Sequence, residues 1–152
     1  MDICIICNFQ LEEKQIIRRA RMRDKDGKPQ ADRITYKARC PNCEIYLRKH
    51  NQGKTEGHWG ISNIKERDLK AELSESEFLK LKITVEKKLE EIIDSYMFKR
   101  EKWIEFITIK KQNDKVYEFS QYDGDYIING YVIKRDNYFI SEYITEIKKN
   151  VD

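Results

Sequence analysis

The chain has 152 residues, of which 39% are apolar and 38% are charged, so it suffices for one ordinary domain or two small ones. No apolar run approaches the roughly 18 residues that span a bilayer. The N-terminus also lacks the basic region and the cleavage site of a secretory signal. We therefore expect a cytoplasmic protein with no membrane partner, in which cysteine thiols stay reduced.

The formal net charge of +3 is unevenly distributed along the chain. Residues 1–70 contain 16 Lys or Arg against 10 Asp or Glu, a net of +6. Residues 71–152 contain 14 against 17, a net of −3. This asymmetry predicts two domains, residues 1–70 and residues 71–152, of which the first is better suited to a polyanion.

The first element is a set of two close cysteine pairs, Cys4 with Cys7 and Cys40 with Cys43. Each C-x2-C pair places two sulfurs on one tight turn, and two such turns complete the tetrahedron that Zn²⁺ prefers. Because all four ligands are thiolates, the predicted ion is structural and keeps no open position for catalysis. An iron–sulfur cluster, a redox pair and simple free thiols are the alternatives.

Residues 14–23 and 32–40 flank a turn marked by Gly27 and Pro29, which predicts a long β-hairpin between the cysteine pairs. With in-register pairing, alternation places one set of side chains on a mostly apolar face, interrupted by Arg18. That set is Ile16, Ala20, Met22, Ile34, Tyr36 and Ala38. The opposite face is then basic and contains Arg19, Arg21, Arg23, Arg33, Lys37 and Arg39.

This predicted basic face suggests nucleic-acid binding, because each cation that meets a phosphate releases counterions and a two-stranded ribbon fits a major groove. An acidic protein surface would use the same side chains. The alternative is a solvated face balanced by Glu12, Glu13 and Asp24. Tyr36 and Tyr46 are candidates for base stacking or for the core.

The segment around residues 50–60 contains three glycines, which predict a loop. It also contains His50, Glu56 and His58, the residues that a metal-assisted nuclease would use. Their spacing matches neither H-E-x-x-H nor the H-x-E motif of a deaminase. We therefore do not expect an enzyme, and a nuclease is the weaker alternative.

The second part begins at Ser74-Glu75-Ser76-Glu77, which has the pattern of a helix capping box. Apolar residues at steps of three or four then predict one long amphipathic helix to about residue 99. These residues are Phe78, Leu81, Val85, Leu89, Ile92 and Tyr96, with Ile93 and Met97 widening the stripe.

The last 50 residues predict short antiparallel strands at 103–110, 115–121, 126–134 and 138–144, and the tail after them predicts a fifth strand or a helical turn. Their aromatic residues predict either a core or a binding surface. These residues are Tyr117, Phe119, Tyr122, Tyr126, Tyr131, Tyr138, Phe139 and Tyr143. The expected fold class is α+β: a zinc ribbon with a long β-hairpin, then the amphipathic helix and a small antiparallel β-sheet or barrel.

The cysteine spacing, with a hairpin between the two pairs, resembles the N-terminal zinc domain of MqsA/YgiT-type antitoxins. This resemblance covers about 45 residues and implies zinc binding by Cys4, Cys7, Cys40 and Cys43. In that family the zinc domain binds the toxin and a following helix-turn-helix domain binds DNA. Here the residues after 70 instead predict one helix and strands.

Two functional hypotheses follow from these patterns. The first is a zinc-binding regulatory protein that binds nucleic acid, or a nucleic-acid machine, through the basic hairpin, while the second domain supplies a homodimer contact or a protein contact. The alternative is a non-enzymatic protein inhibitor, such as an antitoxin, an immunity protein or a phage anti-host factor, which binds its partner through the aromatic C-terminal part.

Overall fold

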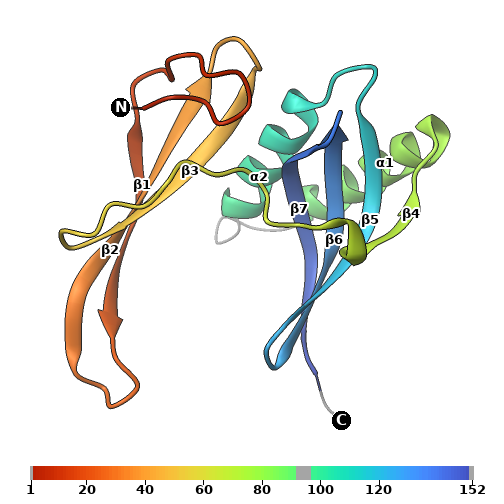
Figure 1. Ribbon diagram of the computed structural model, residues 1–152. Helices are drawn as coiled ribbons and strands as arrows, with labels where there is room; N and C mark the ends of the chain where they lie inside the picture. The colour runs from red at the N-terminus through yellow and green to blue at the C-terminus, as the bar shows by residue number, and fades with distance from the viewer. Residues whose placement is uncertain (1, 92–96, 151–152) are drawn as a thin grey trace. The chain divides into compact units, whose positions relative to one another are not determined.

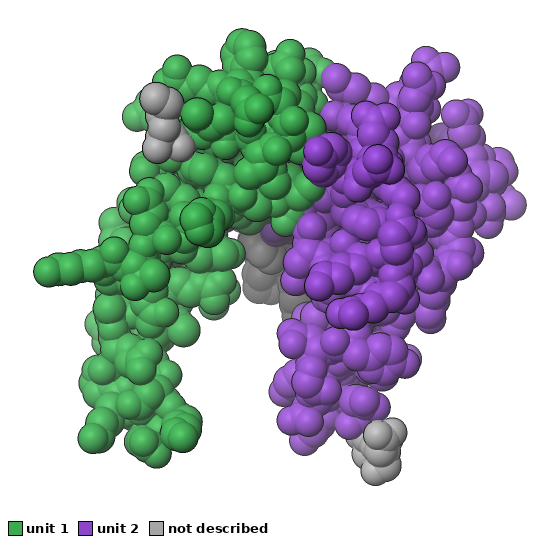
Figure 2. Space-filling model, in the orientation of Figure 1, with its two compact units in different colours: residues 1–61 green, residues 62–152 purple. Residues whose placement is uncertain are grey.

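The computed structural model describes residues 2–91 and 97–150, which form two compact units (Figures 1 and 2). The first unit comprises residues 1–61 and the second comprises residues 62–152. Residues 62–70 fall in the second unit, where Leu69 pairs with Phe119. The described helices and sheets agree with the expected α+β class. None of these helices combines the length and the apolar character needed to cross a membrane.

The first unit is built on a three-stranded antiparallel sheet in the order β1-β2-β3. Its strands are β1 (Gln15–Arg23), β2 (Pro29–Cys40) and β3 (Ile45–Gln52). The β1–β2 hairpin was expected, but β3 was not, and it extends into the segment predicted to be a loop. After β3 the chain returns along its outer edge, where Gly60 and Arg48 exchange both backbone hydrogen bonds, of 2.8 and 3.0 Å.

The two strand pairs of this sheet differ in regularity. The β2–β3 register is continuous from Arg33 opposite Gln52 to Cys40 opposite Ile45. The β1–β2 register shifts twice, between Ile16 and Arg18 and again between Ala20 and Met22. The assumption of in-register pairing is therefore wrong for β1. Because successive residues of a strand face opposite sides, each shift changes which side chains of β1 share a face with those of β2.

The core of the first unit lies on one face of this sheet. Ala38, Ile45 and Leu47 point to this face and are buried together with Leu11 and Trp59. The N-terminal segment is attached there by backbone bonds from Leu11 to Asp2 and from Glu12 to Arg39, each 2.9 Å long. The N-terminal segment and the segment after β3 thus cover one face of the sheet.

The second unit contains an open four-stranded antiparallel sheet in the order β4-β5-β6-β7, not a closed barrel. Its strands are β4 (Leu69–Glu72), β5 (Lys115–Asp123), β6 (Tyr126–Arg135) and β7 (Tyr138–Lys149). A 3₁₀ turn (Glu66–Asp68) precedes β4. The three C-terminal strands were expected, and β7 also includes most of the tail.

Helix α1 (Glu75–Glu90) begins at the expected capping box. The Ser74 hydroxyl accepts a hydrogen bond from the Glu77 amide at 3.2 Å, and the Ser74 amide donates to the Glu77 carboxylate at 3.0 Å. The single long helix is not observed, because α1 ends at Glu90 and a second helix begins at Met97. The predicted stripe positions Ile92, Ile93 and Tyr96 lie outside the described residues.

The strand predicted at residues 103–110 is wrong, because these residues belong to helix α2 (Met97–Ile109), apart from Lys110. Their isoleucines and aromatic residues favour a strand by composition. In the structure Trp103, Phe106 and Ile109 recur at steps of three and are buried, whereas Ile104 is 58% exposed. This helical spacing packs one side of α2 against the sheet, and tertiary contacts outweigh the local propensity.

Different parts of the chain cover the two faces of the four-stranded sheet. The helices lie against one face (Figure 1), where the Trp103 ring meets Tyr143 at a centroid distance of 4.9 Å and Phe106 at 5.7 Å. On the other face Ile64 packs with Phe119 and Val132. Some of the predicted aromatic residues are therefore core, whereas Tyr122 and Tyr126 are exposed.

Candidate metal centre and basic sheet face

The four cysteine thiols of the first unit come together, as their spacing predicts. Their sulfur atoms all lie within 4.8 Å of one another, and the Cys7 and Cys40 sulfurs are 3.5 Å apart without a disulfide. Four sulfurs at about 2.3 Å from a tetrahedral zinc ion would be about 3.8 Å apart. The cluster therefore has a size and a donor set compatible with one zinc ion.

The two cysteine pairs have the same local backbone geometry. The amide of Asn8 donates to the Cys4 carbonyl at 2.9 Å, and the amide of Glu44 donates to the Cys40 carbonyl at 2.8 Å. Both donors adopt positive φ, of 61° at Asn8 and 57° at Glu44. Left-handed residues are uncommon outside glycine, so their recurrence at matching positions indicates two copies of one turn.

Each turn sits at the end of a short antiparallel pair. Cys40 is paired with Ile45 at the end of the β2–β3 ladder. The Cys4 amide bonds to the Phe9 carbonyl at 2.9 Å, and the next residue outward, Ile3, forms a bridge with Gln10. Backbone amides also approach the buried sulfurs, at 3.4 Å for Cys4 and 3.3 Å for Cys40. Such amide donors would stabilise thiolates.

Burial affects the acidity of these thiols unequally. Removal from water raises the pKa of Cys40 and of Cys43, because the charged thiolate is disfavoured in a buried site. The pKa of Cys7 is lowered to about 6, chiefly by a hydrogen bond with the Asn42 side chain. Without a cation the cluster therefore retains protons on its buried members, and metal binding would release them.

Cations collect on the sheet face opposite the core of the first unit. Paired residues of an antiparallel ladder share a face, and so do alternate residues of one strand. Arg33, Lys37 and Arg39 therefore share a face of β2, where Arg18 lies opposite Thr35 and Arg48 lies opposite Lys37. We call this set, Arg18, Arg33, Lys37, Arg39 and Arg48, the basic face.

The strand pairing places three of the six basic residues predicted to share a face, Arg33, Lys37 and Arg39, on one face. Arg19 lies opposite Ile34 and so belongs to the other side of the sheet. Arg21 and Arg23 lie beyond Ala20, at and after the second register shift, and the Arg23 guanidinium donates to the Gly27 carbonyl at 2.9 Å. The first register shift instead brings Arg18 onto the basic face.

Two further members of this surface could not be identified because β3 was not predicted. Arg48 and His50 alternate along β3, but the buried Lys49 between them obscures this alternation in the sequence. Tyr46 also belongs to this face, and the Lys37 ammonium lies 4.2 Å from its ring centroid. Tyr36 faces the other side, with the Lys14 ammonium 4.8 Å from its ring centroid. Each of the two tyrosine rings thus has a lysine ammonium beside it.

Two acidic groups contact the basic face at Arg39, next to the cysteine cluster. The Arg39 guanidinium contacts the Glu12 carboxylate at 3.0 Å and the Glu44 carboxylate at 4.0 Å. Further along the sheet, Arg33 and Arg48 act electrostatically on His50. Burial, followed by these two arginines, holds the pKa of His50 below its ordinary value.

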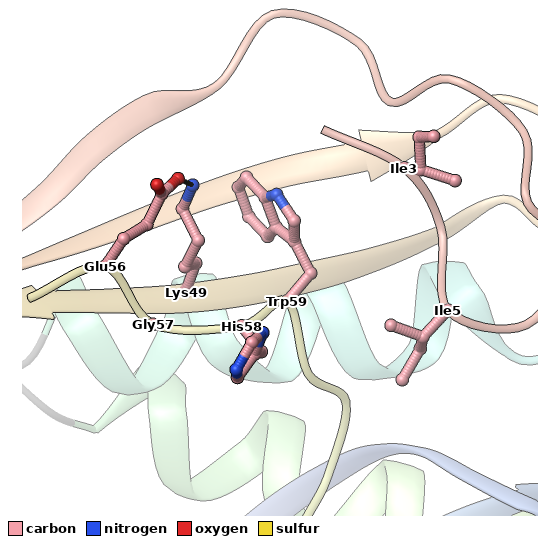
Figure 3. Close-up of a pocket in the computed structure, with 7 residues that line it drawn as sticks. All are labelled: Ile3, Ile5, Lys49, Glu56, Gly57, His58 and Trp59. Carbon is pink, nitrogen blue, oxygen red and sulfur yellow. Dashed lines mark hydrogen bonds and ion pairs between the residues drawn. The ribbon is translucent and has the colours of Figure 1, made fainter. Parts of the chain in front are cut away.

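The three residues considered for a nuclease are not assembled into one site. His50 lies on the basic face, where its Nδ1 atom is 2.8 Å from the Thr35 hydroxyl. The neighbouring Lys49 points to the opposite face and donates to Glu56 at 2.9 Å. Glu56 and His58 line a separate cleft on that side of the sheet (Figure 3).

This cleft has a volume of about 370 Å³ and is lined by Ile3, Ile5, Lys49, Glu56, Gly57, His58 and Trp59 (Figure 3). The buried Lys49 ammonium contacts Glu56 and also Asp2, at 3.4 Å. The Trp59 indole donates to Asp2 at 2.9 Å. That bond lowers the pKa of Asp2, with further help from Lys14 and Lys49. Lys49, Glu56 and the Trp59 indole therefore already have partners and tie three chain segments together.

Gly57 allows the segment after β3 to approach that strand closely. A Cβ atom at this position would lie 2.1 Å from the His50 carbonyl oxygen, which is too short for any side chain. The Gly57 amide donates to the Asn51 side chain at 2.9 Å. This close approach helps to place Glu56 and Trp59 over Lys49.

No protein-family model matches the chain, and no curated protein or solved structure matches it. The resemblance to MqsA/YgiT-type antitoxins therefore has no support beyond the four cysteines. The thiol cluster and the distribution of charge around it are the features of the chain that bear on its function.

Proposed function

We propose that the first unit is a zinc ribbon whose structural Zn²⁺ is held by Cys4, Cys7, Cys40 and Cys43, and that the protein is a regulator that binds nucleic acid, or a nucleic-acid machine, through the basic face. The zinc would join the turn at the N-terminus to the turn between β2 and β3. In this arrangement the metal has no open coordination position for catalysis, and it stabilises the fold of the sheet.

The observation that carries this proposal is the sorting of side chains between the two faces of one sheet. Apolar groups and the satisfied Lys49 network occupy the covered face. The five cations of the basic face occupy the other, where Arg39 is paired with Glu12 and Glu44. Cations arranged in this way can neutralise phosphates and release their counterions.

The metal is tested by its stoichiometry. Protein purified without chelators should contain one zinc per chain by elemental analysis, and Cys40→Ser should reduce this value because it removes a fully buried ligand. Purified protein with no stoichiometric metal, under conditions that keep the thiols reduced, would contradict the zinc proposal. Iron in place of zinc would indicate the cluster alternative.

The register of β1 gives a matched test of nucleic-acid binding. Arg18→Glu and Arg19→Glu make the same charge change at neighbouring positions, but only Arg18 lies on the basic face. We expect Arg18→Glu to weaken binding to short DNA or RNA about tenfold or more at low salt. Arg19→Glu should have a clearly smaller effect, and the salt dependence of binding should fall only for Arg18→Glu.

Fluorescence anisotropy with labelled single-stranded and double-stranded oligonucleotides, at several salt concentrations, measures this difference. Circular dichroism and zinc content serve as controls that both variants are folded. Equal losses for the two variants would show that binding follows net charge and not the basic face. No binding of the wild-type protein to any of these oligonucleotides would end the proposal.

Exposed apolar side chains at one end of the second sheet support a second candidate, a non-enzymatic inhibitor that binds a protein. Tyr122, Tyr126 and Ile147 are 70%, 51% and 60% exposed. Tyr126 and Ile147 share a face, because Ile147 lies opposite Ile128, two residues from Tyr126. Uncovered aromatic and aliphatic groups of this kind are typical of protein interfaces.

This candidate is tested in nuclease-treated lysate with the wild-type protein and the double variant Tyr126→Asp, Ile147→Asp. A stoichiometric protein partner that is retained by the wild type and lost by the variant would favour the inhibitor. A partner that is lost on nuclease treatment would favour the nucleic-acid regulator instead. Self-association that the double variant removes would identify this end of the sheet as a homodimer contact.

A further inference from the structure

Strand β1 is the open edge of the three-stranded sheet in the first unit. The other edge strand, β3, is covered where Arg48 exchanges backbone bonds with Gly60 and where Gln52 pairs with Thr55. Along Gln15–Arg23, the described part of the chain supplies backbone partners from β2 alone. In an antiparallel sheet, alternate residues of an edge strand direct their N–H and C=O groups away from the neighbouring strand. β1 therefore presents a row of backbone donors and acceptors along its outer side.

The side chains of β1 leave both of its faces accessible. Seven of its nine residues are exposed, and only Ala20 and Met22 are half-buried. Ile16 and Ile17, near the start of the strand, are 47% and 46% exposed. The strand contains no proline, so each residue keeps its amide donor. A second extended chain can therefore lie against β1 along most of its length.

The charge of β1 is entirely positive. The strand contains no acidic residue and four arginines, Arg18, Arg19, Arg21 and Arg23. Within the described residues, the first three of these arginines form no ion pair. Arg18 and Arg19 are neighbours in an extended strand and therefore lie on opposite faces of the sheet. Uncompensated positive charge is thus found on both sides of this edge, and not on the basic face alone.

These features disfavour the pairing of β1 with a second copy of itself. Two copies would bring arginines together, and like charges on adjacent strands are destabilising. The register shift between Ile16 and Arg18 distorts the edge, which also protects a free strand from self-association. A strand with acidic side chains meets the opposite situation, because its carboxylates approach guanidinium groups that have no ion-pair partner.

We propose that β1 is the docking edge for an extended acidic segment of a protein partner, which joins the sheet as a fourth strand beside β1. Backbone hydrogen bonds to β1 supply affinity in this mode of recognition, and the arginines select the charge of the segment. Because the arginines lie on both faces, the segment carries acidic residues at consecutive positions and not only at alternate ones. Apolar residues at one end of the segment would contact Ile16 and Ile17. This interaction goes beyond the proposed binding of nucleic acid, which uses one face of the sheet.

A synthetic peptide of about ten residues is the probe for this docking edge. It contains a run of Glu and Asp followed by alternating Val and Thr, and a peptide of reversed sequence tests the opposite strand direction. We expect saturable binding of one of these two peptides by fluorescence anisotropy. A peptide in which Gln and Asn replace the acidic residues should bind at least about tenfold more weakly. Binding of neither acidic peptide would overturn the proposal.

The peptide backbone distinguishes strand addition from simple attraction between charges. In an added antiparallel or parallel strand, only alternate residues donate hydrogen bonds to β1. N-methylation of one set of alternate residues should therefore weaken binding about tenfold or more, whereas N-methylation of the other set should leave it nearly unchanged. Equal affinities of the two methylated peptides would show that binding does not use the backbone, and the added strand would be wrong.

Arg19→Glu provides the test on the side of the protein. Arg19 lies outside the basic face, so this variant should weaken peptide binding about tenfold and have little effect on nucleic-acid binding. Lys54→Glu makes the same charge change in the turn after β3, and its effect on peptide affinity should be clearly smaller. Circular dichroism and zinc content verify that both variants are folded. Equal losses in the two variants would show that peptide affinity follows net charge, which would remove the docking edge.

Hydrogen exchange locates the added strand on the sheet. The amides of β1 that point away from β2 should exchange rapidly in the free protein and more slowly with the acidic peptide bound. The amides of β3 should not change. Slower exchange in another segment, with none in β1, would contradict the inference.

The docking edge and the proposed function can fail separately. Oligonucleotide binding without binding of either acidic peptide would retain the regulator and remove the docking edge. Peptide binding that meets the tests above, without oligonucleotide binding, would retain the docking edge and overturn the proposed function.

Discussion

The Glu77 carboxylate is a titratable group at the start of helix α1. It accepts a hydrogen bond from the Ser74 amide, and this bond lowers its pKa below the ordinary value of 4.5. A group with a lowered pKa in the folded state contributes stability that is present above its unfolded pKa. This contribution disappears as the pH falls through the folded value.

We therefore expect part of the stability of the second unit to be lost as the pH falls below about 4.5. Glu77→Gln should remove that part of the pH dependence, because glutamine still accepts the capping bond but does not ionise. Denaturant unfolding at pH 7, 5 and 3.5 measures the difference. Ser74→Ala, which removes the other half of the capping box, should instead cost about 1 kcal/mol at every pH. Identical pH dependence in the wild type and Glu77→Gln would show that this bond makes no contribution.

Single residues also show where sequence patterns were sufficient. The spacing of the four cysteines predicted their convergence, because a C-x2-C pair has few ways to fold around a shared ion. The capping box at Ser74 was equally local and was confirmed. The face of Arg18 was not predictable, because it depends on a register shift at Ile17 that no pattern in β1 indicates.

At the scale of elements, the position of the segment after β3 depends on the close approach of one glycine to the backbone of β3. Gly57→Ala would place a methyl group against the His50 carbonyl and should destabilise the first unit by at least about 2 kcal/mol. Gly60→Ala is the matched control, because its Cβ would lie 3.9 Å from the Arg48 carbonyl oxygen, an ordinary contact.

Thermal or denaturant unfolding of the first unit, followed through Trp59 in a variant without Trp103, measures both substitutions. The same change of stability in the two variants would show that the contact at residue 57 is not responsible, because the lower chain entropy of the unfolded state stabilises both alanine variants alike.

Two elements were misassigned from the sequence, for the same physical reason. Residues 103–110 have strand-like composition but form a helix, since the burial of Trp103 and Phe106 against the sheet determines the outcome. β3 was hidden because its buried lysine, Lys49, breaks the apolar alternation that marks a strand. Only the partners of Lys49, Asp2 and Glu56, make its burial acceptable, and they are distant from it in sequence or outside the strand.

In the whole molecule, tryptophan fluorescence can report on the folding of each unit separately. Each unit contains one buried tryptophan, Trp59 in the first and Trp103 in the second. All four cysteines proposed to bind zinc belong to the first unit. Removal of zinc should therefore unfold one unit and leave the other intact.

We expect a zinc chelator to shift the emission of Trp59 to longer wavelength in Trp103→Phe, because its loss of structure exposes the indole to water. The emission of Trp103 in Trp59→Phe should stay unchanged under the same conditions. Re-addition of zinc should restore the first signal. A change in both signals would show that the second unit depends on the fold of the first, and a change in neither would show that the sheet needs no metal.

The separation of the two cysteine pairs along the chain has a consequence for biosynthesis. Cys7 and Cys40 are 33 positions apart. At typical elongation rates, the first pair emerges from the ribosome about 2–7 s before the second. During that interval the thiols of the first cysteine pair lack the second pair and are exposed to oxidants and to competing metals. If the cluster binds zinc as proposed, the zinc supply of the cell at the time of translation would thus set the yield of folded protein.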